Sequence, residues 1–393
     1  MTSFESNGRN ASKTDGIHME IINPNTILFP TIGYPIPPKK IGINVPIKFS
    51  VSINHTSSNY FYLNNLQALT PELMTSNGQI IQGHLVTDNL VTNQQSKQPD
   101  TSQSRQSDWW RIRPKCRTTF FVTAKLFWQN NSLQLKIPTI PDYVLDNFRS
   151  NYFWYFDALE TKTYQLRFIL NSEMRDTYVS SSNINQEALE RETSSDILAT
   201  PWVNLRLVQL LSTDSNAIEV DGVLFKIDMP ESLLTIPSKL FQAKTNVKLG
   251  IYITNNTSTT LCFYQLSSID AILISDDGKP INWSGNPTKL AWKNNEQNYY
   301  LVQPGEKMFL DLCGKLFWNY SQLEFAISSK THSLNGESGF YYFSNLKAGT
   351  SYHLQVIYQV SELRARRLEE QVLQKFWSGR IAMPLVEFRL IKP

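Results

Sequence analysis

The feature that most constrains the fold of this chain is an internal repeat. The stretch Val-Pro-Ile-Lys-Phe-Ser-Val-Ser-Ile at 45–53 returns at 245–253 as Thr-Asn-Val-Lys-Leu-Gly-Ile-Tyr-Ile, and Lys-Leu-Phe-Trp at 125–128 recurs unchanged at 315–318. A repeat of this length predicts two copies of one structural unit. The chain has 393 residues, which is enough for two domains with a core each. We predict a first domain at 17–211 and a second at 219–393, joined near 212–221.

Both copies alternate apolar and polar residues with a period of two. Ile47, Phe49 and Val51 are separated by single polar residues, which is typical of a strand with one buried face in an antiparallel sheet. Asn-Gly at 77–78 and Asp-Gly at 277–278 predict tight hairpins, in turns whose two central residues both have positive φ. Only 18% of the residues are charged, and the remaining polar surface is supplied largely by Asn, Gln, Ser and Thr, which suit strands and loops. The pattern predicts an all-β fold.

In each copy a leucine, a turn and a tyrosine open another alternating strand. Leu159 precedes Tyr164, and Leu346 precedes Tyr352. This pattern resembles the tyrosine corner of immunoglobulin-like and fibronectin type III domains. The resemblance implies two tandem immunoglobulin-like antiparallel β-sandwiches, with each tyrosine hydroxyl bonded to backbone a few residues upstream. A leucine stands in both copies where an antibody domain has its second cysteine, so the resemblance is to the superfamily and not to a functional subfamily.

Several segments interrupt the repeat. Residues 1–16 form a polar tail, and 86–107 is an insertion in the first copy that is rich in Gln, Ser and Thr; we predict both to be disordered. A long insertion precedes the last strand of each copy, at 171–195 and at 361–376. The second insertion predicts a helix from Leu363 to Phe376, because its apolar residues follow a helical spacing. Residues 185–192 are a shorter counterpart in the first copy.

The sequence carries no recognisable catalytic or metal-binding set. The five histidines have no ligand spacing, and no CxxC, HExxH, GxSxG or glycine-rich phosphate loop is present. We therefore predict a protein that is not an enzyme and that binds no metal or cofactor. The odd number of cysteines, Cys116, Cys262 and Cys313, predicts reduced packing residues and not a disulfide framework.

Charge and hydropathy limit the partners and the location. A formal net charge of +3 is too small to indicate nucleic-acid binding, and no apolar run approaches the roughly 18 residues of a membrane span. Residues 1–16 lack the apolar core of a secretory signal, which predicts a cytoplasmic protein. The expected partner is a protein, and a homo-oligomer or a subunit of a complex is compatible with the sequence.

Outward aromatic residues and the helical insertion are the candidate partner-binding residues. They are Phe127, Phe317, Trp109, Trp110, Leu363, Arg366, Arg367, Leu368 and Val372. Phe127 and Phe317 should point away from the core, because each precedes an inward tryptophan, and they could serve either a partner or the contact between domains. Trp109 and Trp110 could present a motif or simply begin a strand. The helix could project to a partner or fold back on its own sheet.

The function that fits best is non-catalytic protein binding or scaffolding by two β-sandwich modules. A first alternative is an intracellular peptidase inhibitor. Asn-Pro-Thr at 286–288 matches a loop in one family of immunoglobulin-like protease inhibitors, which implies a similar role for that loop. A second alternative is carbohydrate binding through exposed aromatic residues.

Overall fold

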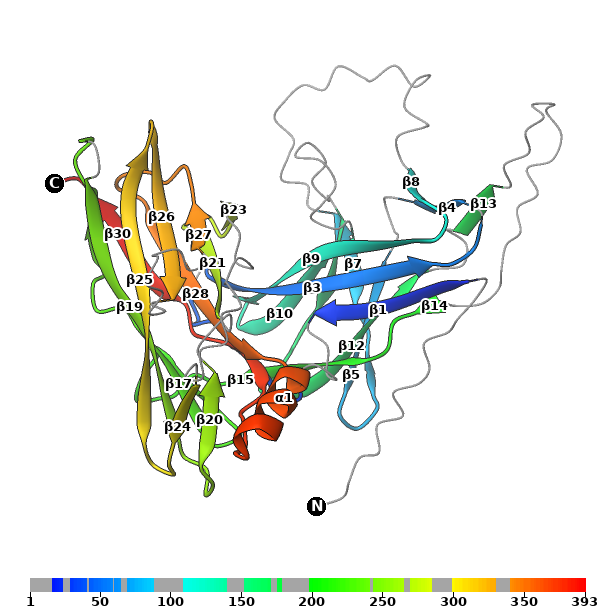
Figure 1. Ribbon diagram of the computed structural model, residues 1–393. Helices are drawn as coiled ribbons and strands as arrows, with labels where there is room; N and C mark the ends of the chain where they lie inside the picture. Colours follow the sequence, from blue (N-terminus) through cyan, green and yellow to red (C-terminus); the bar gives the residue numbers. More distant parts are fainter. Residues whose placement is uncertain are drawn as a thin grey trace. The chain divides into compact units, whose positions relative to one another are not determined.

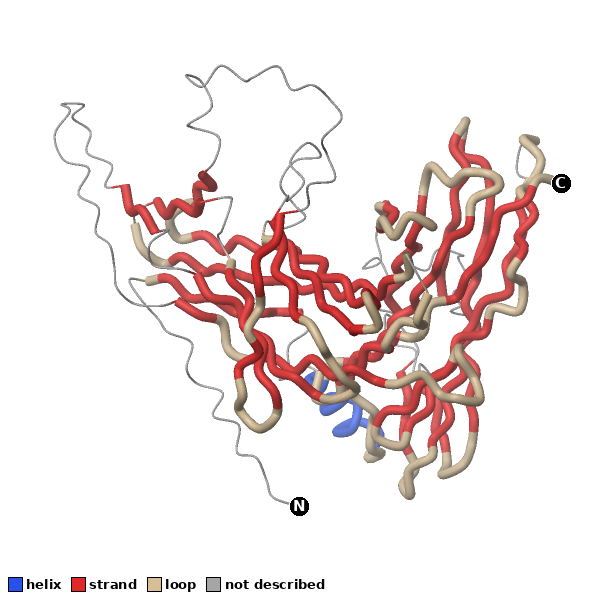
Figure 2. Tube along the Cα trace, turned by 180° about the vertical axis from the view of Figure 1, so that it is seen from behind, coloured by secondary structure: helices blue, strands red, loops and turns tan. Residues whose placement is uncertain are grey.

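The protein has an all-β fold (Figures 1 and 2). The computed structural model describes residues 16–23, 29–40, 42–58, 60–64, 69–87, 109–139, 152–170, 175–178, 198–240, 243–264, 269–284, 299–329 and 340–393. By their contacts, the residues divide into unit 1, residues 1–25 and 46–205, and unit 2, residues 26–45 and 206–393. The sequence placed residues 26–45 and 206–211 in the first domain and residues 212–218 in the linker. By their contacts, all of them belong to unit 2.

Unit 1 contains two main sheets and one small sheet. The first sheet has the order β1 (Ile17–Asn23), β3 (Asn44–His55), β9 (Cys116–Gln129), β10 (Ser132–Pro138), β11 (Tyr152–Phe156) and β7 (His84–Thr87). The second has the order β15 (Val203–Val208), β12 (Thr163–Leu170), β5 (Thr70–Thr75) and β6 (Ile80–Ile81), and β14 (Leu198–Ala199) also pairs with β12. The last three residues of β15, from Arg206 on, belong to unit 2. The small sheet has the order β13 (Arg175–Tyr178), β4 (Tyr60–Asn64) and β8 (Trp109–Ile112).

Unit 2 has corresponding sheets. The first has the order β16 (Ala217–Val220), β17 (Val223–Asp228), β19 (Lys244–Asn255), β25 (Lys307–Asn319), β26 (Gln322–Ser329), β27 (Phe340–Phe343) and β23 (Trp283–Ser284). The second has the order β18 (Leu233–Thr235), β30 (Val386–Ile391), β28 (Ser351–Val360), β29 (Gly379–Ala382) and β2 (Ile32–Pro35). Strand β21 (Ile269–Ser275) pairs with β28 and with β22 (Pro280–Ile281), and a separate pair is formed by β20 (Leu261–Tyr264) and β24 (Tyr299–Val302).

The strand order is the same in both units. In the first sheet of unit 1 the order is β3, β9, β10, β11 and β7. In the first sheet of unit 2 the corresponding order is β19, β25, β26, β27 and β23. Most pairs are antiparallel, as expected, but β2 pairs in parallel with β15 and β29, and β18 pairs in parallel with β30. β2 and β18 each follow an antiparallel strand in the sequence, and each adds a parallel strand to a later one, β2 at Leu207 and Val208 of β15 and β18 at β30.

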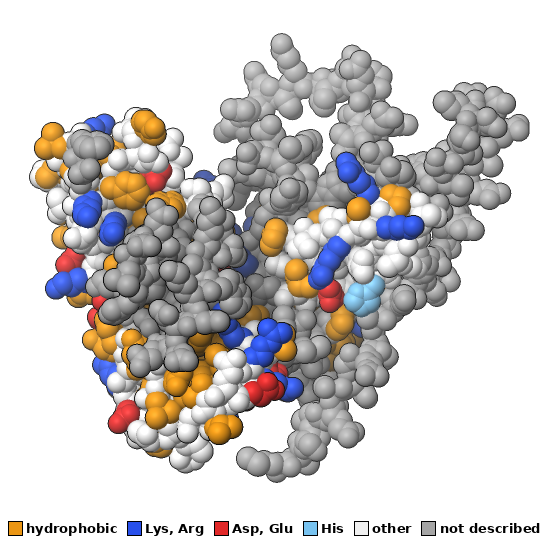
Figure 3. All heavy atoms as spheres, in the orientation of Figure 1, with side chains coloured by type: hydrophobic (Ala, Val, Ile, Leu, Met, Phe, Trp, Pro, Cys, Tyr) orange, Lys and Arg blue, Asp and Glu red, His pale blue; other side chains and the backbone are white. Residues whose placement is uncertain are grey.

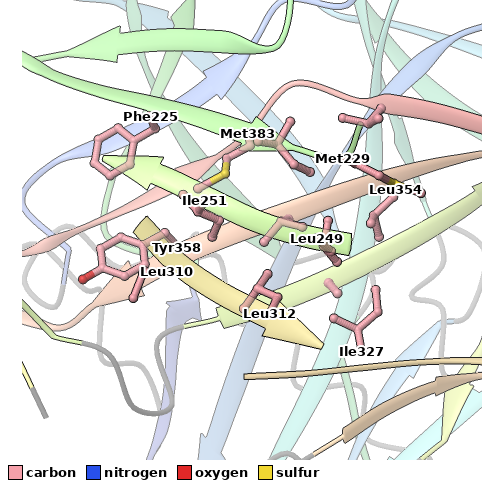
Figure 4. Packing of buried hydrophobic residues seen from close by; sticks show 14 of the residues in the cluster. Phe225, Met229, Leu249, Ile251, Leu310, Leu312, Ile327, Leu354, Tyr358 and Met383 are labelled. Carbon is pink, nitrogen blue, oxygen red and sulfur yellow. The ribbon is translucent and has the colours of Figure 1, made fainter. Parts of the chain in front are cut away.

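The core of unit 2 lies between its two main sheets (Figure 4). Phe225, Ile251 and Leu310 from the first sheet are fully buried or nearly so, as are Leu354 and Tyr358 from β28. The alternation read from the sequence produces this arrangement, because every second side chain of each strand enters the core. Each such side chain contributes about 1.5–3 kcal/mol by leaving water.

The predicted tyrosine corners are confirmed in their hydrogen bonds. The hydroxyl of Tyr164 accepts from the backbone N–H of Glu160 at 2.8 Å, and that of Tyr352 accepts from the N–H of Lys347 at 2.8 Å. Both rings are buried. Each bond therefore fixes the turn before the strand to the strand itself.

The two predicted hairpins form, but with a different turn. Gly78 and Gly278 have φ of 85° and 74°, whereas neither Asn77 nor Asp277 has a positive φ, so the expectation for both central residues was wrong. The N–H of Gly78 donates to the carbonyl of Thr75, which makes an ordinary turn followed by a left-handed glycine. Such a loop needs positive φ at the glycine alone.

Helix α1 (Glu362–Val372) is shorter than predicted. Ser361 caps its first turn by accepting from the N–H of Arg364, and the chain turns into a left-handed conformation at Leu373. Phe376 matches the helical spacing but lies in extended chain, paired with Cys262 of β20. In the described part of the chain no helix is long and apolar enough to cross a membrane. Residues 1–15, 88–107 and the predicted counterpart at 185–192 lie outside the described residues.

Candidate functional site

Within the described residues, the strand pair β20–β24 has one edge with which no strand pairs. Cys262 uses its N–H and its carbonyl to bond the segment after α1, at Lys375 and Trp377, with distances of 2.8 and 2.9 Å. Because bonding alternates along a strand, the neighbours of Cys262 bond β24 through Tyr300 and Val302. The N–H and carbonyl of Leu301 therefore point away from β20. Among the described strands none pairs with this outer edge.

Helix α1 is held beside this pair by aromatic and polar contacts. The guanidinium of Arg364 lies 4.4 Å from the ring centre of Tyr264, and the rings of Tyr299 and Phe376 meet edge to face at 5.4 Å. The carboxylate of Glu369 accepts from the N–H of Phe376 at 2.8 Å. These contacts fix the helix and the segment that follows it to the side of β20.

Burial and charge also act on Cys262, which the helix helps to cover. Its side chain is fully buried, and all three cysteines are free. Burial raises the pKa of the Cys262 thiol, and the Glu369 carboxylate raises it further, because both disfavour the thiolate. A thiol in this environment is a packing group and a poor nucleophile.

Exposed apolar side chains gather at this end of unit 2. Tyr300 and Leu301 are 40% and 47% exposed, and Leu363 at the start of α1 is 55% exposed. Arg366 and Arg367 are also exposed, and Arg366 forms an ion pair with Glu362. Figure 3 shows hydrophobic side chains over β20 and β24, with charged side chains over α1. We call the set Tyr300, Leu301, Leu363, Arg366 and Arg367 the end surface.

The structure divides the predicted residues of the insertion into two groups. Leu363, Arg366 and Arg367 lie on the end surface, whereas Leu368 and Val372 pack against the core of unit 2. The apolar stripe of the helix thus folds back on its own unit. The side of the helix that carries Leu363, Arg366 and Arg367 is therefore the side available to a partner.

The predicted Trp109 and Trp110 occupy the corresponding strand in unit 1. They begin β8, the terminal strand of its small sheet, opposite Asn64 and Leu63; their side chains lie outside the described residues. Tyr299 and Tyr300 hold the same register in β24. Sequence reasoning missed Tyr300 and Leu301, although the matching aromatic pairs at 109–110 and 299–300 were a usable signal.

The predicted Phe127 and Phe317 lie on the outer side of their sheets, where each packs on an aromatic neighbour. Phe127 meets Tyr155 at 6.5 Å between ring centres, and Phe317 meets Tyr342 at 6.3 Å. The ammonium of Lys136 lies 3.8 Å from the centre of the nearby Phe153 ring. The sequence signal for these partners is Phe-Trp-Tyr-Phe at 153–156 and Phe-Tyr-Tyr-Phe at 340–343. Both phenylalanines are half-buried by these contacts, which makes them weaker candidates than the end surface.

An open depression of about 410 Å³ lies elsewhere in unit 2. Its lining residues are Pro280, Ile281, Asn282, Trp283, Ser284, Ser344 and Asn345. Trp283 is exposed and meets Tyr341 edge to face at 5.1 Å. The lining has no ionisable side chain. The Asn-Pro-Thr motif at 286–288 lies outside the described residues, which themselves contain no cluster of His, Cys, Asp and Glu suited to a metal ion.

Comparisons with known proteins supply no family. No protein-family model matches the chain, and no curated protein matches it. Among solved structures, the native conformation of E. coli alpha-2-macroglobulin aligns with 91% of this chain and 25% of that chain, at 7% identity and a TM-score of 0.17. The chain therefore spans about a quarter of that protein, and a similarity this low carries no argument about function.

Proposed function

We propose that this protein is a non-catalytic protein-binding protein, built as a tandem pair of immunoglobulin-like β-sandwiches. The same strand order in both units and the two tyrosine corners support the architecture. The observation that carries the binding role is the outer edge of β24, with which none of the described strands pairs and on which Tyr300 and Leu301 are exposed. The partner contributes an extended segment that pairs with this edge.

An open strand edge suits a protein partner for two reasons. The outward N–H and carbonyl of Leu301 offer the hydrogen bonds that an added strand needs, and these bonds require no particular sequence. The side chains of β24 then supply selectivity. β24 carries no charged residue and no proline, two features that usually protect an edge from unwanted pairing, although it has only 4 residues. An edge that lacks these two features is consistent with a regular occupant.

The test compares partner capture by matched full-length variants. Leu301→Pro removes the outward N–H of β24 and leaves the bonds to β20, which use Tyr300 and Val302. Leu240→Lys is the control, since Leu240 is an exposed leucine of unit 2 outside the end surface. Proteins captured from lysate of the source organism are quantified by mass spectrometry. A partner retained by wild type and Leu240→Lys but lost by Leu301→Pro supports the proposal; the same proteins in all three samples would reject it.

Point substitutions are preferable to deletion of the helical insertion. Removing 363–375 would also remove Leu368 and Val372 from the core, together with the Lys375 carbonyl that accepts from Cys262. Loss of binding would then not be separable from damage to the fold. The double variant Leu363→Asp, Arg367→Asp changes only exposed side chains and tests the helix face by the same capture assay.

A second candidate is carbohydrate binding at the depression beside Trp283. An exposed aromatic ring next to the amides of Asn282 and Asn345 and the hydroxyl of Ser284 is the combination that stacks on and hydrogen-bonds to a sugar. Electrophoresis in gels containing polysaccharide tests this role. Retardation of wild type that Trp283→Ala abolishes would support it, and equal mobility with and without polysaccharide would exclude the polymers used.

A further inference from the structure

Unit 2 includes a strand that comes from far away in the sequence. β2 pairs on one edge with the end of β15, where Tyr34 lies opposite Leu207, and on the other edge with β29, where Ile32 lies opposite Arg380. The N–H of Arg380 donates to the carbonyl of Thr31 at 2.7 Å. β2 thus fills a gap between two strands, which we call the strand slot. The corresponding strand β18 has one neighbour, β30, among the described strands.

The centre of the slot is a buried polar cluster. Tyr34 and Arg380 are each 1% exposed. The guanidinium of Arg380 bonds the amide oxygen of Gln359 and lies 3.7 Å from the carboxylate of Asp270. Burial raises the pKa of the Tyr34 hydroxyl, so this group stays neutral beside the arginine. A buried charge of this kind is costly unless neighbouring groups compensate it, and here Gln359 and Asp270 do so in part.

Glycines make the slot selective for the strand that fills it. A Cβ at Gly33 would lie 3.1 Å from the Val220 side chain and 3.2 Å from that of Ile381, which is tighter than nine in ten real contacts of a Cβ. A Cβ at Gly379 would approach the Thr31 carbonyl to 2.6 Å. The slot therefore accepts an extended segment in which a glycine is followed by a large aromatic residue.

Polar contacts outside the slot hold the same segment in place. Lys40 forms an ion pair with Glu387 at 3.0 Å, and the hydroxyl of Thr31 donates to Asp221 at 3.2 Å. The N–H of Ile36 donates to the Val208 carbonyl at 2.9 Å. All three contacts join the segment to residues after 206, which lie in unit 2.

We infer that the strand slot is a peptide-binding site of unit 2, filled within the chain by residues 31–36. The ligand class is an extended peptide that pairs in parallel with β29, presents glycine at the position of Gly33 and buries an aromatic ring at the position of Tyr34. This role is separate from the end surface, since it concerns a different edge and an occupant that the chain itself supplies.

The first test cuts the chain on both sides of the segment that fills the slot, in the full-length protein. Recognition sequences for a specific protease are inserted within 24–28 and at position 41, and the cut protein is passed over a sizing column under native conditions. We expect the peptide spanning residues 29–40 to elute with the protein, and the same peptide carrying Tyr34→Ala to separate from it. Separation of the peptide with its natural sequence would overturn the inference.

The second test needs no cleavage, so it remains decisive if the cut protein precipitates. Hydrogen exchange is measured by mass spectrometry in full-length Gly33→Val and in the control Leu233→Val, which changes the exposed corresponding residue of β18. Gly33→Val should speed exchange at 379–382 by at least tenfold and leave β9 and β10 unchanged. The control should change neither region. Unchanged exchange at 379–382 in Gly33→Val would overturn the inference.

Discussion

The two tyrosine corners permit a prediction that separates the stability of the two units. Tyr352→Phe removes the hydroxyl that accepts from the Lys347 N–H at 2.8 Å and leaves the ring in place. The net loss of one hydrogen bond costs about 1 kcal/mol, and leaving the partner without a bond raises this to about 1–3 kcal/mol. For a unit of unit 2's size, each kcal/mol lowers the melting temperature by about 2–4 °C. We therefore expect a decrease of about 2–12 °C.

The assay is scanning calorimetry of the full chain, with hydrogen exchange to assign the transitions. Tyr352→Phe should lower the transition of unit 2, and Tyr164→Phe should lower that of unit 1 by a similar amount, since its hydroxyl accepts from Glu160 at the same distance. Tyr320→Phe is the control, because Tyr320 is exposed. A change below 0.5 °C in both corner variants would refute the reasoning, as would a corner variant that destabilises only the opposite unit.

Three further outcomes follow from the structure. Gly78→Ala should cost about 1 kcal/mol for its positive φ alone, because nothing lies within 4 Å of the added Cβ, whereas Gly278→Ala should cost more, since its Cβ would meet the Asn44 amide at 2.6 Å; denaturant titration compares them. Native protein should react with maleimide at Cys116 and Cys313 and not at the buried Cys262, as peptide mapping would show. Burial lowers the pKa of His353, so the unfolded chain binds a proton more readily and stability should fall as the pH drops below about 6.5. His353→Gln should weaken that dependence in denaturant titrations at pH 7.5 and 5.5, and an identical pH profile would contradict the assignment.

The sequence predicted the features that depend on local pattern. Alternation identifies strands because one face of each must leave water, and the glycines at 78 and 278 mark turns because few other residues adopt positive φ. The tyrosine corners were readable because their hydrogen bonds span only four or five residues. The outward orientation of Phe127 and Phe317 follows from the same period, as their strand neighbours Leu126 and Leu316 are fully buried.

Features that depend on distant partners could not be read in this way. The sequence around 31–36 does not indicate that β2 pairs with β29 as well as with β15. The corresponding strand β18 occupies the same place in the repeat, yet among the described strands it pairs with β30 alone. Phe376 matches the helical spacing, but the Glu369 carboxylate and the backbone of Cys262 bind its segment as extended chain. The outer edge of β24 was missed for the same reason. Whether a strand lies at an edge depends on its neighbours in the sheet, and its own sequence does not identify them.

The origin of β2 has a consequence for synthesis of the protein on the ribosome. Residues 32–35 are made early, whereas their partner at 379–382 follows roughly 340 residues later, which is roughly 20–70 s at ordinary elongation rates. During that interval β15 is made and can pair with one edge of the strand, but the edge that pairs with β29 has no partner and the Tyr34 ring lacks Arg380. A nascent chain stopped before residue 379 should therefore be sensitive to proteases near its beginning, and release of the full chain should end that sensitivity.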